Sequence, residues 1–109
     1  AATQAMTGQR LVQDALFCAN DMMAFGALDA LRRVGWRVPD DVLVAGYDDV
    51  PAATWGSFDL TTVVHDHQAM VAAAIAILHD RMTDSGTDPA DGVTTTVPVR
   101  LAERATTRR

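Results

Sequence analysis

The sequence contains no lysine, and all nine of its basic residues are arginine. This absence excludes chemistry that needs a lysine amine, such as Schiff-base catalysis or phosphate binding by a P-loop. Its 14 acidic residues give the chain a net charge of −5, so it offers no overall positive charge to nucleic acid. Arg104, Arg108 and Arg109 gather near the end of the sequence, where we expect a frayed, solvated tail.

Cysteine and long apolar runs are also scarce. Cys18 is the only cysteine, so an intrachain disulfide is impossible. It lies in the apolar run 16–19, which favours a buried thiol over a nucleophile. No apolar run approaches the roughly 18 residues that span a bilayer. We therefore expect a protein without a membrane span, in a reducing, cytoplasmic compartment.

Catalytic and metal-binding motifs are missing as well. Neither G-x-S-x-G nor G-x-G-x-x-G occurs, which predicts that the chain is not an enzyme. His65 and His67 would share one face of an extended segment, a spacing that can bind a metal, but a metal site needs three or four ligands. We expect no metal and no cofactor, and we expect His79 to be a solvated helix residue.

What the sequence does contain is a strand–helix–strand pattern. Short apolar runs at 15–19 and 42–45 are typical of strands buried on both faces of a parallel sheet. The segment 22–34 between them has helical periodicity, with Asp21 as the expected N-cap and Gly35 as the terminator. This pattern predicts a right-handed parallel βαβ unit and an α/β fold.

The rest of the chain predicts a third strand, a second helix and a last strand. The third strand is expected at 60–64, and an alanine-rich helix at about 66–82. A loop of polar and glycine residues follows at 83–92. The last strand is predicted from apolar residues that alternate from Val93 to Leu101, and Pro98 restricts it to a sheet edge or a bulge.

The helix 22–34 carries two apolar stripes. One consists of Ala24, Ala27, Leu28, Leu31 and Val34, and the other begins with Met22 and Phe25 and continues to Asp29. Two stripes predict burial on two sides, by the sheet and by a second partner. Trp55 and Phe58, in the following loop 51–59, look exposed. We therefore expect the chain to self-associate through this helix and the loop around Trp55.

Polar residues follow both buried strands, Asn20 after the first and Asp48 after the second. Ligands of open α/β sheets bind outside the carboxyl ends of the strands. An amide beside a carboxylate suits a polyhydroxylated or amine-bearing ligand. The alternative, that both residues merely cap turns, is about equally well supported by position alone.

Four motifs resemble the effector domain of LacI/GalR transcriptional regulators, in the same order and at similar spacing. They are FCANDMMAFGAL at 17–28, RVPDDV at 37–42, VAGYDDVP at 44–51 and LTTV at 60–63. The resemblance implies the periplasmic-binding-protein-like type I fold, in which two α/β subdomains enclose an effector, and here only its C-terminal portion. Residues 1–63 would belong to the C-terminal subdomain, 64–92 would form a crossover, a helix of the N-terminal subdomain and a loop, and 93–109 the final strand and tail.

The resemblance also implies residue roles. Asn20 and Asp48 match effector contacts, and His65 lies on a crossover where the family commonly has Gln. Phe25 matches the family's dimer interface, as does the loop that holds Ala52 and Trp55; Met22 and Asp29 join them by their place on the same stripe.

The implied partners are a small, sugar-like effector, a second copy of the chain, and operator DNA through an N-terminal helix-turn-helix that this sequence lacks. An alternative is a solute-binding protein of a sugar transport system, which shares the fold and the ligand position. An enzyme that uses His65 and His67 is the least favoured hypothesis.

Overall fold

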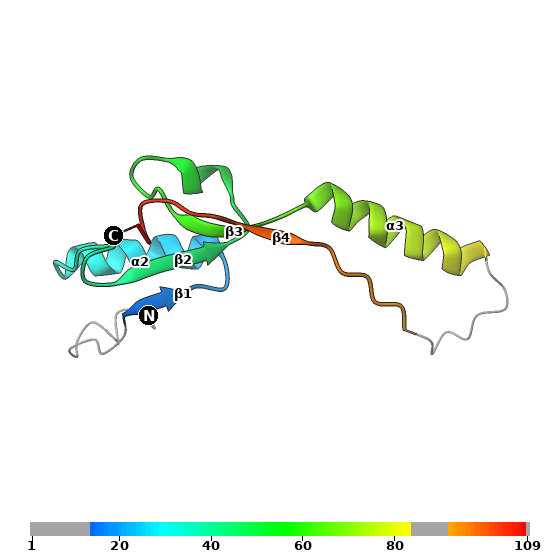
Figure 1. Cartoon of the computed structure of the whole chain (residues 1–109), viewed down its shortest axis with the longest axis horizontal. Helices are drawn as coiled ribbons and strands as arrows, with labels where there is room; N and C mark the ends of the chain where they lie inside the picture. Colours follow the sequence, from blue (N-terminus) through cyan, green and yellow to red (C-terminus); the bar gives the residue numbers. More distant parts are fainter. Residues whose placement is uncertain (1–13, 84–91, 109) are drawn as a thin grey trace. The chain divides into compact units, whose positions relative to one another are not determined.

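A computed structural model describes residues 14–83 and 92–108 of the chain (Figure 1). The parts of the predicted segments that fall on residues 1–13, 84–91 and 109 lie outside this description. The chain divides into two compact units, one of residues 1–64 and 100–109 and the other of residues 65–99.

The sheet has four strands in the order β1-β2-β3-β4. The strands are β1 (Ala15–Phe17), β2 (Leu43–Tyr47), β3 (Thr61–His65) and β4 (Val99–Ala102). β2 pairs in parallel with β1 on one side and with β3 on the other, so the predicted α/β fold with a parallel βαβ unit is confirmed. β4 lies at an edge, as Pro98 predicts, but it begins after that proline, and Val93 and Val97 are outside any strand.

The helix α2 (Asp21–Arg33) connects β1 to β2 and lies along the sheet (Figure 1). Its N-cap is Asn20, whose side chain accepts a hydrogen bond from the amide of Met23, so the prediction that Asp21 is the cap is wrong. Asp21 is instead a fully buried residue of the first turn. Gly35 follows the helix with a φ of +80°, the conformation expected of a terminating glycine.

The core of the first unit lies between α2 and the sheet. It consists of the α2 residues Ala24, Phe25, Leu28 and Leu31, Val44 of β2 with Val42 just before that strand, and Ala53 and Leu60 from the connection to β3. Full burial of a Leu or Val side chain contributes about 1.5–3 kcal/mol. The predicted apolar stripe with Leu28 and Leu31 is thus the face that holds the helix on the sheet.

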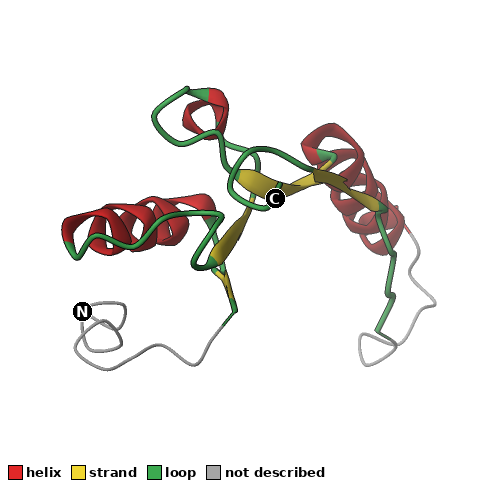
Figure 2. Cartoon of the chain, turned by 60° about the vertical axis from the view of Figure 1, so that its left-hand side comes forward, coloured by secondary structure: helices red, strands yellow, loops and turns green. Residues whose placement is uncertain are grey.

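Of the second stripe of α2, Phe25 is covered within the chain, whereas Met22 and Asp29 are exposed. Phe25 is 9% exposed, and its ring stacks on that of Phe58 with centroids 4.1 Å apart. Phe58 comes from the loop after the short helix η1 (Pro51–Thr54), which lies between β2 and β3 (Figure 2). The prediction that Phe58 is exposed is wrong because this loop folds back onto α2, whereas Trp55 is exposed.

The end of the chain is also packed, contrary to the predicted frayed tail. The amide and side chain of Thr106 bond to the carbonyl of Asp59 and the amide of Thr61, and Thr106 itself is buried. Arg104 is half-buried, whereas Arg108 is exposed and donates to the carbonyl of Glu103. Polar contacts rather than apolar periodicity hold this segment, which is why the sequence pattern misses them.

The second unit contains the helix α3 (His67–Thr83), which begins after Asp66, whose carboxylate accepts a bond from the amide of Ala69. None of the α3 residues is buried. His79 is exposed, as predicted. Within residues 14–83 and 92–108, no helix is both long enough and apolar enough to cross a membrane.

Candidate functional site

Asn20 and Asp48 follow the carboxyl ends of two neighbouring parallel strands. β1 ends at Phe17, which pairs with Ala45, and β2 ends at Tyr47. Both polar residues are half-buried. The two predicted effector residues therefore come from the same edge of the sheet, the edge at which ligands of open α/β sheets bind.

Asn20 has a structural role as well as the predicted ligand role. Its Oδ1 accepts a hydrogen bond of 2.8 Å from the amide of Met23, which caps α2. The cap uses only the oxygen of the side chain, and the amide nitrogen carries two further donor hydrogens. Capping therefore orients the side chain without using its donors.

The turn after β2 has an uncommon backbone conformation. Asp48 has a φ of 117° and Asp49 a φ of 55°, values that residues other than glycine rarely adopt. The amide of Asp48 donates to the carbonyl of Val63 at 3.0 Å, and the amide of Asp49 donates to Oγ1 of Thr62 at 3.4 Å. Such conformations persist where surrounding contacts hold them, and they are concentrated at functional sites.

Asp21 ties three elements together beneath this turn. Its Oδ2 accepts from the amide of Val50 at 2.9 Å, and its Oδ1 accepts from the hydroxyl of Thr62 at 2.6 Å. A Cβ at Gly46 would collide with the Asp21 carboxylate, so glycine is required in the middle of β2. Sequence reasoning missed this role, although a glycine inside an apolar strand is a sign of such a close approach.

Arg104 forms the second contact that sequence reasoning missed. Its Nη2 lies 2.6 Å from Oδ1 of Asp49, in an ion pair whose side chains are 17% and 19% exposed. Its Nη1 donates to the carbonyl of Leu60 at 2.8 Å. The guanidinium group therefore connects the turn after β2 to the residue that precedes β3.

His65 is the last residue of β3 and belongs to the second unit. Its ring meets that of His67 edge to face, with centroids 4.1 Å apart. Among the described residues, no group of three or more His, Cys, Asp or Glu side chains could hold a metal ion. An effector contact from His65 stays a prediction.

Partial burial raises the pKa of the Cys18 thiol, which lowers its thiolate fraction and its reactivity.

The residues predicted at a dimer interface differ in exposure. Met22 is 69% and Trp55 60% exposed, whereas Phe25 is in the core and Ala52 packs partly against it. Asp29 is exposed and pairs with Arg33 along the helix at 3.0 Å. Of these five residues, Met22 and Trp55 are therefore the apolar ones with side chains accessible to another chain.

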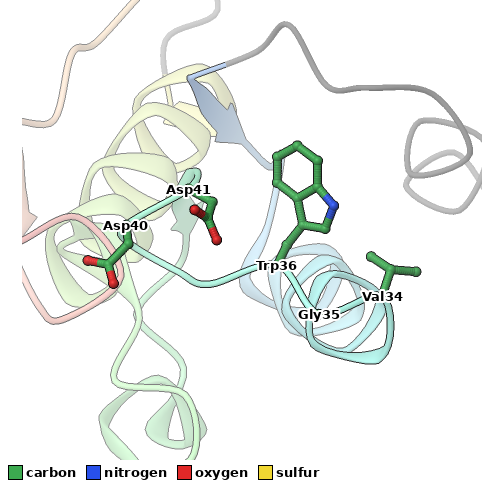
Figure 3. Close-up of a pocket in the computed structure, with 5 residues that line it drawn as sticks. All are labelled: Val34, Gly35, Trp36, Asp40 and Asp41. Atoms are coloured by element: carbon green, nitrogen blue, oxygen red, sulfur yellow. The ribbon is translucent and has the colours of Figure 1, made fainter.

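A hollow elsewhere on the first unit is separate from the predicted site. Figure 3 shows its lining residues Val34, Gly35, Trp36, Asp40 and Asp41, which follow α2 and precede β2. They lie at the amino end of β2, opposite to Asp48. None of the predicted effector residues lines this hollow, so we do not assign the effector to it.

The comparisons with known proteins agree with this architecture. Residues 1–107 match the model of the periplasmic binding protein-like domain. The chain is 41% identical, over 80 residues, to the HTH-type transcriptional repressor PurR of Histophilus somni, a match that covers 70% of this chain and 24% of the repressor. The chain belongs to the periplasmic binding protein-like family, in the form found in LacI/GalR-type regulators.

Solved structures give the same family. The lac repressor dimer bound to operator and the anti-inducer ONPF matches 97% of this chain and 36% of its own chain, with a TM-score of 0.83 and 30% identity. A LacI family regulator from Lactobacillus casei with bound sucrose matches 95% of this chain and 38% of its own, with a TM-score of 0.73 and 31% identity. The predicted resemblance is confirmed, and the chain spans about a quarter of the length of the Histophilus somni repressor.

Proposed function

We propose that this chain is the effector-sensing and dimer-forming portion of a LacI-type transcriptional regulator that works in the cytoplasm. A small, sugar-like molecule binds at the carboxyl edge of the sheet, and its binding changes the operator affinity of a helix-turn-helix in the same regulator. The observation that carries the proposal is the position of Asn20 and Asp48 after two adjacent parallel strands. Their donors and acceptors match the paired hydroxyl groups of a saccharide.

The sugar class is supported by the chemistry of this edge and by the sucrose that the Lactobacillus casei relative binds. Calorimetric titration of the chain with sucrose and a panel of other mono- and disaccharides tests it. We expect Asp48→Ala to weaken binding by about 1.5–3 kcal/mol, the loss typical of a hydrogen bond to a charged group. Asp40→Ala, an exposed carboxylate at the other end of β2, is the control and should bind as the wild type does. Equal affinities of the wild type and Asp48→Ala would contradict the assignment.

Self-association is proposed through Met22 and Trp55, with Ala52 and Asp29 beside them. Exposed large apolar side chains on adjacent elements are typical of interfaces, and two-fold symmetry allows a helix to contact its own copy. Phe25→Glu is unsuitable as a test because Phe25 is in the core. Met22→Glu should instead yield a folded monomer in sedimentation velocity, whereas Met70→Glu, an exposed methionine of α3, should not change the assembly. A dimer of Met22→Glu as tight as that of the wild type would place the interface elsewhere.

The chain itself is not expected to bind operator DNA specifically, because its net charge is −5. A gel-shift measurement at increasing salt tests this. A sequence-selective shift that persists at high salt would show that DNA is read by these residues and would contradict the assignment of DNA binding to a separate segment.

A further inference from the structure

The turn that carries Asp48 needs external support. Asp48 and Asp49 both have positive φ values, 117° and 55°, although neither is glycine. Three amides of the turn donate hydrogen bonds: that of Asp48 to the carbonyl of Val63, that of Asp49 to Oγ1 of Thr62, and that of Val50 to the carboxylate of Asp21. Contacts on Asp49, in the middle of the turn, therefore affect the position of the neighbouring Asp48.

A charged side chain contacts the middle of the turn: Arg104 pairs with Asp49. The 2.6 Å ion pair between Arg104 and Asp49 is more than four-fifths shielded from solvent on both sides, so water and salt weaken it less than a surface pair. The same guanidinium donates to the carbonyl of Leu60 at 2.8 Å. The guanidinium group therefore contacts the chain just before β3 through Nη1 and the turn after β2 through Nη2.

The backbone of Arg104 is fixed too, and it comes just after β4. Its amide donates to Oγ1 of Thr61 at 2.7 Å, and its carbonyl accepts from the same hydroxyl at 3.1 Å. The chain passes from the second unit to the first between Val99 and Arg100, within β4. One side chain therefore joins the end of this returning strand to the turn that carries Asp48.

We infer that Arg104 is a positioning residue for Asp48, and that it couples effector binding to the returning strand β4. The inference rests on the proposed effector role of Asp48. Arg104 acts through Asp49: the ion pair keeps the turn in its positive-φ conformation, and a shift of β4 that moves Arg104 loosens the turn and weakens the site. By thermodynamic reciprocity, an effector on Asp48 favours the position of β4 in which the pair is formed.

Amide hydrogen exchange measured by NMR on the 109-residue chain tests the positioning role without a ligand. In Arg104→Gln we expect the amides of Asp48, Asp49 and Val50 to exchange at least about tenfold faster, while the amides of Leu28 and Leu31 keep their rates. Arg104→Lys should restore part of the protection, because it keeps the charge but cannot contact Asp49 and Leu60 in the same geometry. Arg108→Gln is the control, because Arg108 is exposed and contacts only the neighbouring Glu103 carbonyl among the described contacts.

Two results would overturn the inference. One is unchanged exchange at the turn in Arg104→Gln; the other is equal acceleration of the turn and the α2 core, which indicates a general loss of stability. If Arg104→Gln does not fold, Asp49→Asn removes the charge of the partner with little change in volume, and the same expectations and the same two overturning results apply to it.

Binding of sucrose is the second arm. We expect Arg104→Gln to weaken sucrose binding about tenfold and Arg108→Gln to leave it unchanged. If the wild type binds sucrose and Arg104→Gln binds it equally well, the inference is wrong while the proposed function stands. If the wild type binds none of the saccharides, the proposed sugar class fails, and the exchange measurement still decides whether Arg104 positions the turn.

Discussion

The two units of this chain differ in how their helices meet the rest of the protein. In the first unit, α2 buries seven of its residues, and Leu28 and Leu31 are completely inaccessible. In the second unit, α3 buries none. Its Ile77 is half-buried, and its five other large apolar side chains are between 46% and 77% exposed: Met70, Val71, Ile75, Leu78 and Met82. Apolar composition alone therefore does not decide burial.

The difference follows from what each helix packs against. α2 contacts β2, and Phe58 covers a further part of it, so its apolar stripe is matched by apolar partners in its own unit. α3 contains five alanines, two methionines and one leucine, which are good helix formers and favour helix by local propensity. The family resemblance assigns such a helix to the other subdomain, and we propose that α3 docks there in the complete regulator.

The sharpest test of this comparison is a matched pair of leucine truncations. Leu28→Ala removes a side chain that is 0% exposed and should cost about 2–5 kcal/mol of unfolding free energy. Leu78→Ala removes one that is 60% exposed in a good helix position and should change stability by about 0.5 kcal/mol or less. Urea denaturation of both variants measures the difference. Comparable losses would mean that α3 is packed and that the two helices do not differ as described.

A pair of glycine substitutions should give effects of opposite sign within the first unit. At Gly46 an added methyl group would meet Asp21 and Leu60, so Gly46→Ala should cost about 1–3 kcal/mol. At Gly26, in the middle of α2, nothing lies within 4 Å, and Gly26→Ala should stabilise the helix by about 0.5–1 kcal/mol. Urea denaturation of both glycine variants measures the two changes in unfolding free energy. If Gly46→Ala is tolerated, the tight contact between α2 and β2 is not required.

The hydroxyl of Thr62 tests the polar part of the same contact. Thr62→Val keeps the shape of the side chain but leaves the buried Oδ1 of Asp21 without its 2.6 Å donor. We expect a loss of about 1–3 kcal/mol, the usual cost of a buried polar atom that loses its partner. Thr95→Val, at an exposed position of the second unit, should change stability little. A neutral Thr62→Val would mean that Asp21 finds another donor.

The sequence predicts local elements of this fold better than distant polar contacts. The runs at 15–19 and 42–45 and the periodicity of 22–34 place β1, β2 and α2 within one or two residues, because burial on a sheet leaves a regular apolar pattern. Because Asn20 and Asp48 each follow a predicted parallel strand, their sequence positions alone place them at the carboxyl edge of the sheet. These features depend only on neighbours in the sequence.

The errors concern residues whose partners lie far along the chain. The sequence predicts Asp21 as an N-cap because its hydrogen-bond partners, Val50 and Thr62, lie 29 and 41 residues away. It predicts Arg104 as part of a solvated tail because its ion-pair partner, Asp49, lies far from it in the sequence. Phe58 looks exposed because it lies in a loop with no periodicity, and its partner Phe25 is 33 residues earlier in the sequence. A single ion pair or a stacked ring leaves no repeating pattern, so sequence reasoning has little to detect.

The smallest expected effect concerns Asp41, in the connection between α2 and β2. Hydrogen bonds from the side chain and backbone of Arg37 lower the pKa of the Asp41 carboxyl below the ordinary value of 3.8. Because the folded state favours the charged form, this stabilisation is complete above the ordinary pKa and is lost as the pH falls through the lowered one.

We therefore expect Asp41→Asn to lower the denaturation midpoint slightly at neutral pH, and we expect its difference from the wild type to shrink as the solution is acidified below about pH 4. In an Arg37→Gln background the same substitution should have less effect, because the partner that lowers the pKa is gone. Urea titrations at a series of pH values measure both. A difference that is constant with pH, or unchanged by Arg37→Gln, would mean that the carboxylate acts through backbone contacts rather than through its charge. The hydrogen bond from the Arg37 amide to Asp41 would then stabilise the segment before β2 without a contribution from charge, as the hydrogen bond from the Val50 amide to Asp21 stabilises the segment after β2.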